Sequence, residues 1–125
     1  MRIIYAEDDL ALQQVVRIHL ESAGHIVEVV NNGRELLDRL ERSHDFDVII
    51  TDHNMPCMTG LEALRRIKED DRFKHLPTIV LSGNNGNSLL AKDVKQLGGT
   101  FIDKYEWGML FSTINSIAAE QKGGA

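Results

Sequence analysis

Acidic residues stand out at two places in the sequence because they directly follow a run of apolar residues. Asp52 follows residues 48–51, which read Val-Ile-Ile-Thr, and three acids at positions 7–9 follow residues 3–6, which read Ile-Ile-Tyr-Ala. Runs of this length and composition predict buried strands. If the two strands lie side by side, three or four carboxylates come together at one edge of a sheet. Carboxylates in such a cluster repel one another, so we expect a cation among them.

The expected cation is Mg²⁺, with Mn²⁺ as an alternative, because a set of oxygen ligands favours these hard ions over zinc. Magnesium commonly uses only one or two carboxylates of a protein, which leaves Asp52 free to act as a nucleophile. A carboxylate that attacks phosphorus forms an acyl phosphate. Ser82 and Lys104 end two other apolar runs, and a hydroxyl and an ammonium group both suit the negative charge of that product.

The rest of the chain supplies the elements that would position these side chains. Strict alternation of strand and helix patterns predicts an α/β fold, a doubly wound parallel sheet of five strands with five helices. Ligands of such folds bind at the carboxyl ends of the strands, where the acids, Ser82 and Lys104 stand. The expected strands are residues 2–6, 26–30, 47–51, 78–82 and 100–103, and helical spacing of apolar residues covers 12–23, 36–40, 61–67, 90–97 and 110–118.

Capping residues mark the ends of several expected helices. Thr59 and Glu62 have the spacing of a capping box for the third helix. Gly24 follows the first helix, where a glycine C-cap is common. At the start of the same helix, Asp8 and Asp9 are both suited to the N-cap position. Capping is therefore an alternative to cation binding for one of these two acids.

Length and composition limit the class of protein. The 125 residues predict one domain over residues 1–120 and a flexible tail at residues 121–125. A net charge of −5 without a basic stripe argues against direct nucleic-acid binding by this chain. We expect no membrane contact and a cytoplasmic location, because no apolar run is long enough to span a bilayer, the N-terminus shows no signal-peptide pattern, and the single Cys57 suits a reducing compartment.

Each candidate residue also has an ordinary structural role open to it. Asp52 can be a turn former, Lys104 a solvated surface lysine, and Ser82 a plain loop residue. His53 is not expected in the site, because side chains alternate along a strand, and Phe101 on the last strand is most simply a core residue. The combination of residue types at successive strand ends, rather than any one of them, favours the functional interpretation.

The chain resembles the receiver domain of two-component response regulators, from residue 3 to about residue 119. The similarity lies in residues 6–9 (Ala-Glu-Asp-Asp), residues 50–60 (Ile-Thr-Asp-His-Asn-Met-Pro-Cys-Met-Thr-Gly), residues 77–83 (Pro-Thr-Ile-Val-Leu-Ser-Gly) and Lys104. Four motifs in this order, at the ends of four expected strands, are specific in combination. The resemblance implies a flavodoxin-like strand order, 2-1-3-4-5.

The resemblance also implies a role for each site residue. Asp52 would accept a phosphoryl group from the phosphohistidine of a sensor histidine kinase or a histidine phosphotransfer protein. The fourth helix, fifth strand and fifth helix would form an output face for a downstream protein or effector domain. The chain would thus be a signalling switch rather than an enzyme, limited to phosphotransfer onto itself and autodephosphorylation. The remaining implied roles are Mg²⁺ binding by Glu7, Asp8, Asp52 and the backbone carbonyl of Asn54, a switch hydroxyl at Ser82, a phosphoryl counter-charge at Lys104, and a switch aromatic at Phe101.

The sequence departs from the family pattern directly after Lys104. The family usually has proline there, often after a cis peptide, whereas this chain has Tyr105. A cis peptide without proline costs roughly 2.5–4 kcal/mol, so we expect a trans peptide and a re-routed loop. Tyr105 and Trp107 would then lie beside the output face as candidate partner contacts.

Two other functions compete with the phosphorylated switch. The first is a receiver-like module that binds proteins without any phosphate chemistry, which the intact set of acids and Lys104 disfavours. The second is a Mg²⁺-dependent phosphohydrolase that forms an aspartyl phosphate. Such enzymes generally have a second acid two residues after the nucleophile, where this chain has Asn54. A free-standing receiver and a part of a longer regulator or hybrid kinase both remain compatible with the sequence.

Overall fold

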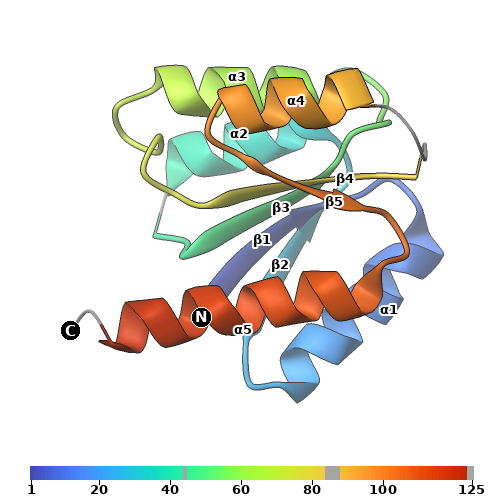
Figure 1. Ribbon diagram of the computed structural model, residues 1–125, viewed down its shortest axis with the longest axis vertical. Helices are drawn as coiled ribbons and strands as arrows, with labels where there is room; N and C mark the ends of the chain where they lie inside the picture. The colour runs from blue at the N-terminus through green and yellow to red at the C-terminus, as the bar shows by residue number, and fades with distance from the viewer. Residues whose placement is uncertain (44, 84–87, 124–125) are drawn as a thin grey trace.

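The computed structural model describes residues 1–43, 45–83 and 88–123, and confirms the predicted α/β fold. Strands and helices alternate along the chain, and all strand pairs are parallel, in the order β2-β1-β3-β4-β5. Helices α1 and α5 lie on one side of the sheet, and α2, α3 and α4 lie on the other (Figure 1). The elements are β1 (Arg2–Ala6), α1 (Leu10–Ser22), β2 (Ile26–Val30), α2 (Gly33–Arg42), β3 (Val48–Asp52), α3 (Gly60–Glu69), β4 (Thr78–Ser82), α4 (Ser88–Gln96), β5 (Thr100–Asp103) and α5 (Trp107–Gly123).

The apolar runs of the central strands are explained by burial on both faces of the sheet. Every residue of β3 and β4 is buried, as is usual for a parallel sheet covered by helices. Alternate residues of β1 enter different cores: Ile3 and Tyr5 pack with α1 and α5, whereas Ile4 and Ala6 pack with α2 and α3. A third, smaller core lies between α3, α4 and the sheet.

The third strand begins and ends one residue later than predicted. The sequence pattern indicated residues 47–51, but the strand is Val48–Asp52. Asp52 pairs with Leu81, and the next backbone N–H, that of His53, donates to the Leu81 carbonyl at 2.8 Å. Because the ladder continues past Thr51, Asp52 is the last residue of the strand rather than the first residue of a loop. Its backbone is therefore fixed by the sheet.

Helix ends follow the capping signals in the sequence. Asp9 is the N-cap of α1, and its Oδ1 accepts from the backbone N–H groups of Ala11 at 2.9 Å and Leu12 at 3.1 Å. Thr59 caps α3 by accepting the Glu62 N–H, which is one half of the predicted capping box. The Glu62 carboxylate bonds to Arg65 and Arg66. Gly24 follows α1 with φ +95°, a left-handed conformation that favours glycine.

The C-terminal helix extends into the segment expected to be a tail. Helix α5 ends at Gly123, so residues 121–123 are helical, and the Gln121 side chain donates to the Asp47 carbonyl. The division into a domain at 1–120 and a tail stays a prediction. Among the described residues, no helix combines the length and the apolar character that crossing a membrane requires.

Candidate functional site

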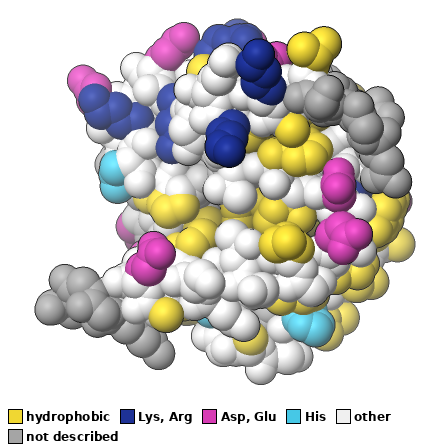
Figure 2. Space-filling model, in the orientation of Figure 1, with side chains coloured by type: hydrophobic (Ala, Val, Ile, Leu, Met, Phe, Trp, Pro, Cys, Tyr) yellow, Lys and Arg dark blue, Asp and Glu magenta, His cyan; other side chains and the backbone are white. Residues whose placement is uncertain are grey.

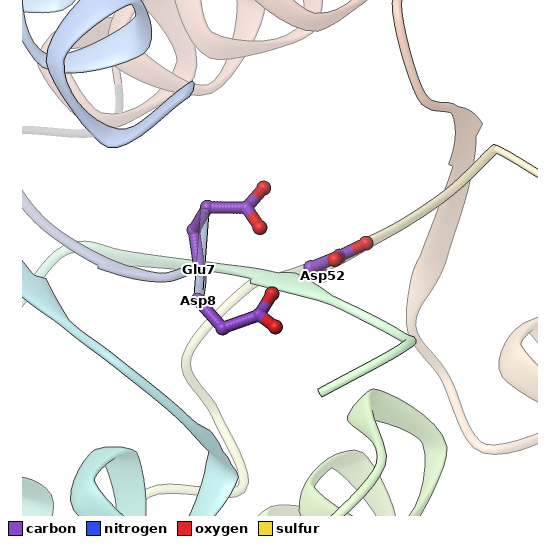
Figure 3. Close-up of side chains that lie close together, drawn as sticks. All are labelled: Glu7, Asp8 and Asp52. Carbon is purple, nitrogen blue, oxygen red and sulfur yellow. The ribbon is translucent and has the colours of Figure 1, made fainter. Parts of the chain in front are cut away.

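Three acids meet at the carboxyl edge of the sheet. Glu7 and Asp8 follow β1, and Asp52 ends β3, which is paired with β1. One carboxylate oxygen from each residue lies within 4.8 Å of the others, and the close-up shows the three side chains close together at the ends of these two neighbouring strands (Figure 3). Glu7 and Asp52 are buried, whereas Asp8 is exposed. The donor set is entirely oxygen, which fits Mg²⁺ or Mn²⁺ and does not fit zinc.

Lys104 joins two of these acids. Its Nζ lies 2.9 Å from Asp52 Oδ2 and 3.0 Å from Glu7 Oε1, and only 11% of its side chain is exposed. Lys104 follows β5, and its backbone N–H donates to the Ser82 carbonyl at the end of β4 at 2.8 Å. Strands β4 and β5 thus position the ammonium group beside acids that follow β1 and end β3.

Burial and charge shift the ionisation of Glu7 and Lys104. Burial raises the pKa of Glu7, and the negative charge of Asp52 raises it further, against hydrogen bonds from Lys104 and the Asp9 N–H that lower it. Burial alone would lower the pKa of Lys104, but its hydrogen bonds to Asp52 and Glu7 prevail and leave that pKa raised. Lys104 is therefore a firmly charged cation between two buried carboxylates.

Two residues that the sequence reasoning did not single out hold Glu7 in place. The Tyr5 hydroxyl donates to Glu7 Oε1 at 3.1 Å, and burial, followed by the charge of Glu7, raises the pKa of Tyr5 well above its ordinary value. The buried Gln13 donates through Nε2 to the Glu7 carbonyl and to Asn31 Oδ1. Tyr5 lies on β1 and Glu7 follows the strand, two residues after Tyr5. Side chains two residues apart in extended backbone point to one face, and this signal could have identified Tyr5.

The acid triplet divides its roles between Asp8 and Asp9. Sequence reasoning left open which of the two caps α1, and the structure assigns the cap to Asp9. Asp8 keeps its carboxylate beside those of Glu7 and Asp52. The alternative in which Asp8 is only a helix cap is therefore wrong.

The backbone around Asp52 is tightly packed. The His53 N–H donates to Asp52 Oδ1 at 3.0 Å, while the Leu61 N–H donates to His53 Nδ1 at 3.3 Å, so the imidazole faces the start of α3. Burial lowers the pKa of His53 despite the nearby charge of Asp52. A Cβ on Gly60 would lie 2.5 Å from the Asp52 carbonyl oxygen, so only glycine fits at this close approach.

The other predicted site residues are Ser82, Asn54 and Phe101. Ser82 is buried at the end of β4, and Asn54 is exposed two residues after Asp52. Phe101 is half-buried on β5 and packs against the core between α3 and α4. The structure therefore brings Glu7, Asp8, Asp52 and Lys104 into one cluster.

The loop after Lys104 takes the predicted alternative course. The Lys104–Tyr105 peptide is trans, and Tyr105 adopts φ +76°, a left-handed conformation that is uncommon outside glycine. The Tyr105 ring is 62% exposed and makes an edge-to-face contact with Trp107, with 5.8 Å between ring centroids. The re-routed loop therefore places the exposed Tyr105 against Trp107, the first residue of α5.

A five-stranded parallel sheet with this strand order and an acidic cluster at its carboxyl edge defines a class of metal-binding α/β domains, and comparisons with known proteins identify the family. The family model of the response regulator receiver domain matches residues 3–106. The chain belongs to this family. Receiver domains are signalling components of two-component systems that work as phosphorylation-controlled switches, and Mg²⁺ binding at an acidic pocket is a general feature of them.

Individual relatives are similar over most of the chain. The chemotaxis protein CheY1 of Helicobacter pylori is 27% identical over 106 residues, covering 83% of this chain and 85% of the relative. The two-component response regulator ORR3 of Oryza sativa is 28% identical, covering 82% and 78%. Among solved structures, a receiver domain protein from Clostridium thermocellum has a TM-score of 0.86 with 26% identity, covering 99% of this chain and 98% of that one. The chemotaxis response regulator CheY4 of Vibrio cholerae has a TM-score of 0.82 with 28% identity, covering 93% and 97%.

Proposed function

We propose that this receiver domain is switched by transfer of a phosphoryl group to Asp52 in the presence of Mg²⁺. The observation that supports this most is the setting of the Asp52 carboxylate. It is buried at the end of β3, 2.9 Å from the Lys104 ammonium and beside the acids of β1. The site thus combines a nucleophile, a positive charge for the phosphorylated product and oxygen ligands for a hard cation.

In the proposed reaction, a carboxylate oxygen of Asp52 forms a bond to phosphorus as the bond between phosphorus and the donor's imidazole nitrogen breaks. The electron pair of that bond leaves with the imidazole, which takes a proton from solvent. Lys104 stabilises the charge of the new phosphoryl group, and Ser82 would donate its hydroxyl to a phosphoryl oxygen. Mg²⁺, held by Glu7, Asp8, Asp52 and the carbonyl of Asn54, would supply further neutralisation of negative charge.

The phosphodonor in this proposal is a sensor histidine kinase or a histidine phosphotransfer protein. Receiver domains interact with sensor histidine kinases and with downstream effectors, which supports this class of donor for the present chain. The activity of the chain itself is limited to accepting and losing the phosphoryl group. A cytoplasmic location belongs to the same proposal, and the lone cysteine is consistent with it.

We place the output face on α4, β5 and α5. Figure 2 shows apolar side chains gathered across the middle of the face that carries these elements in Figure 1. A groove of about 450 Å³ lies there, lined in part by Phe101, Glu106, Met109 and Thr113. Once Ser82 donates to a phosphoryl group, Phe101 would turn inward and reshape this groove. The added charge at Asp52 would thus shift the equilibrium between two conformations of the output face.

The direct test is phosphoryl uptake from a small donor such as acetyl phosphate, measured by intact mass. We expect one phosphoryl group on the wild type with Mg²⁺, and none on Asp52→Asn or after removal of Mg²⁺. Asp103→Asn is the matched control, because it makes the same change at an exposed acid that ends β5, and it should be phosphorylated normally. No uptake by the wild type would instead support the phosphate-independent binding module, and release of free phosphate at enzymatic rates would support the phosphohydrolase.

A further inference from the structure

Tyr5 makes a buried hydrogen bond that the proposed reaction does not use. Its side chain is fully buried in the core formed with α1 and α5, and its hydroxyl donates to Glu7 Oε1 at 3.1 Å. The same oxygen contacts Lys104 Nζ at 3.0 Å, while Glu7 Oε2 accepts from the Asp9 N–H at 3.2 Å. Three donors therefore set the orientation of one carboxylate.

These donors differ in how firmly they are fixed. Lys104 is shared with Asp52 and reaches both acids through a long side chain. A phosphoryl group on Asp52 would compete with Glu7 for Lys104, and a cation at Asp52 would repel Lys104. Tyr5 lies on β1, two residues before Glu7, with a ring enclosed by the core. Its hydroxyl therefore stays in place when Lys104 moves.

Glu7 needs such a fixed partner because its side chain has three rotatable bonds. Without the Tyr5 hydroxyl, Lys104 would be the main side-chain partner of the carboxylate and would draw it towards Asp52. Partners that orient a metal ligand, without touching the metal, commonly set the affinity of a site. We propose that Tyr5 is a positioning residue that fixes Glu7 for Mg²⁺ binding, an inference that rests on the proposed function.

The test compares Mg²⁺ binding by the wild type and by Tyr5→Phe, using calorimetric titration with Mg²⁺ alone. This change removes one oxygen and keeps the ring, and we expect the Kd to rise about 10-fold, the lower end of the effect of losing an orienting partner. Thr78→Val is the matched control, because it removes a buried hydroxyl that bonds to the Leu76 carbonyl at the opposite end of the sheet. Its Kd should equal that of the wild type.

A second measurement separates positioning from general damage. In phosphorylation by acetyl phosphate, the Mg²⁺ concentration for half-maximal rate should rise about 10-fold in Tyr5→Phe, while the rate at saturating Mg²⁺ stays near that of the wild type. In the wild type itself, the ring resonances of Tyr5 should shift on Mg²⁺ addition with the calorimetric Kd. This last measurement keeps the inference testable if Tyr5→Phe does not fold.

Each outcome decides between the two proposals. Three results would overturn the role of Tyr5 and leave the proposed function standing. They are an unchanged Kd for Mg²⁺ in Tyr5→Phe, an equal rise of that Kd in Thr78→Val, and Tyr5 ring resonances that do not shift when Mg²⁺ binds. Failure of the wild type to bind Mg²⁺ at all would overturn the proposed function, and the role of Tyr5 with it.

Discussion

Replacing Lys104 by methionine should destabilise the Mg²⁺-free protein strongly, because it leaves Glu7 and Asp52 buried without their counter-charge. At the observed separations of 2.9 and 3.0 Å, each ion pair has a Coulomb energy of about 5.5 kcal/mol at an effective dielectric constant of roughly 20. Desolvation offsets much of that energy, and removing one partner of a buried ion pair typically costs about 3–5 kcal/mol. We therefore expect the free energy of unfolding to fall by about 3–5 kcal/mol near neutral pH.

The loss should depend on pH in a defined direction. Glu7 already has a raised pKa in the folded protein, and loss of the Lys104 hydrogen bond raises it further. A carboxyl group with a raised folded pKa contributes stability that is fully present below its unfolded pKa and is lost as the pH rises through the folded pKa. The difference in unfolding free energy between Lys104→Met and the wild type should therefore be small below the ordinary glutamate pKa of about 4.3, and it should grow as the pH rises above that value.

Urea unfolding at several pH values in a metal chelator measures this effect, followed by the same series in Mg²⁺. Added Mg²⁺ should recover part of the loss, because the cation neutralises the same carboxylates. Lys95→Met, at an exposed position of α4, is the control and should change the unfolding free energy by less than about 0.5 kcal/mol. A loss below about 1 kcal/mol, or one that does not vary with pH, would refute this account of Lys104.

Three further outcomes are expected. Gly60→Ala should lower the free energy of unfolding by about 1–3 kcal/mol in a thermal or urea melt, because its Cβ would overlap the Asp52 carbonyl, whereas Gly108→Ala, with open space around its Cβ, should not destabilise. Burial lowers the pKa of His53, so the free energy of unfolding of the wild type should fall as the pH drops below about 6.5 and through the folded pKa. In the same melts, His53→Gln should lose less of its unfolding free energy over this pH range. Mg²⁺ at about 100 times its Kd should add about 2.7 kcal/mol of stability, measured as a rise in Tm, and Asp52→Asn should gain less; an equal gain would place the cation elsewhere.

The sequence allowed the architecture and most of the acidic cluster to be predicted, because both depend on local patterns. Continuous apolar runs identified β3 and β4 as buried strands, and polar residues after each run identified the carboxyl edge. Parallel strands bring such residues together whatever the details of packing. The acids at positions 7–9, Asp52 and Lys104 could be named for this reason, and the family resemblance then singled out Glu7 and Asp8.

The remaining features depend on contacts that no local pattern encodes. Tyr5 reads as an ordinary strand residue, and its bond to Glu7 requires the packing of α1 and α5 around its ring. The extra residue of β3 at Asp52 is set by pairing with Leu81. The choice of Asp9 over Asp8 as the α1 cap depends on where the backbone of Glu7 leaves the sheet. Each outcome follows from tertiary geometry, which overrides short-range preference.

The position of Lys104 among the acids also fixes how many cations the pocket can hold. The three clustered carboxylates and the Lys104 ammonium group, which contacts two of them, carry two net negative charges when all are ionised. One divalent cation cancels this charge, whereas a monovalent ion leaves half of it and a second divalent ion reverses it. The arrangement therefore favours a stoichiometry of one Mg²⁺ per chain. Without Lys104, the same three acids would carry three charges, which no single divalent ion could balance.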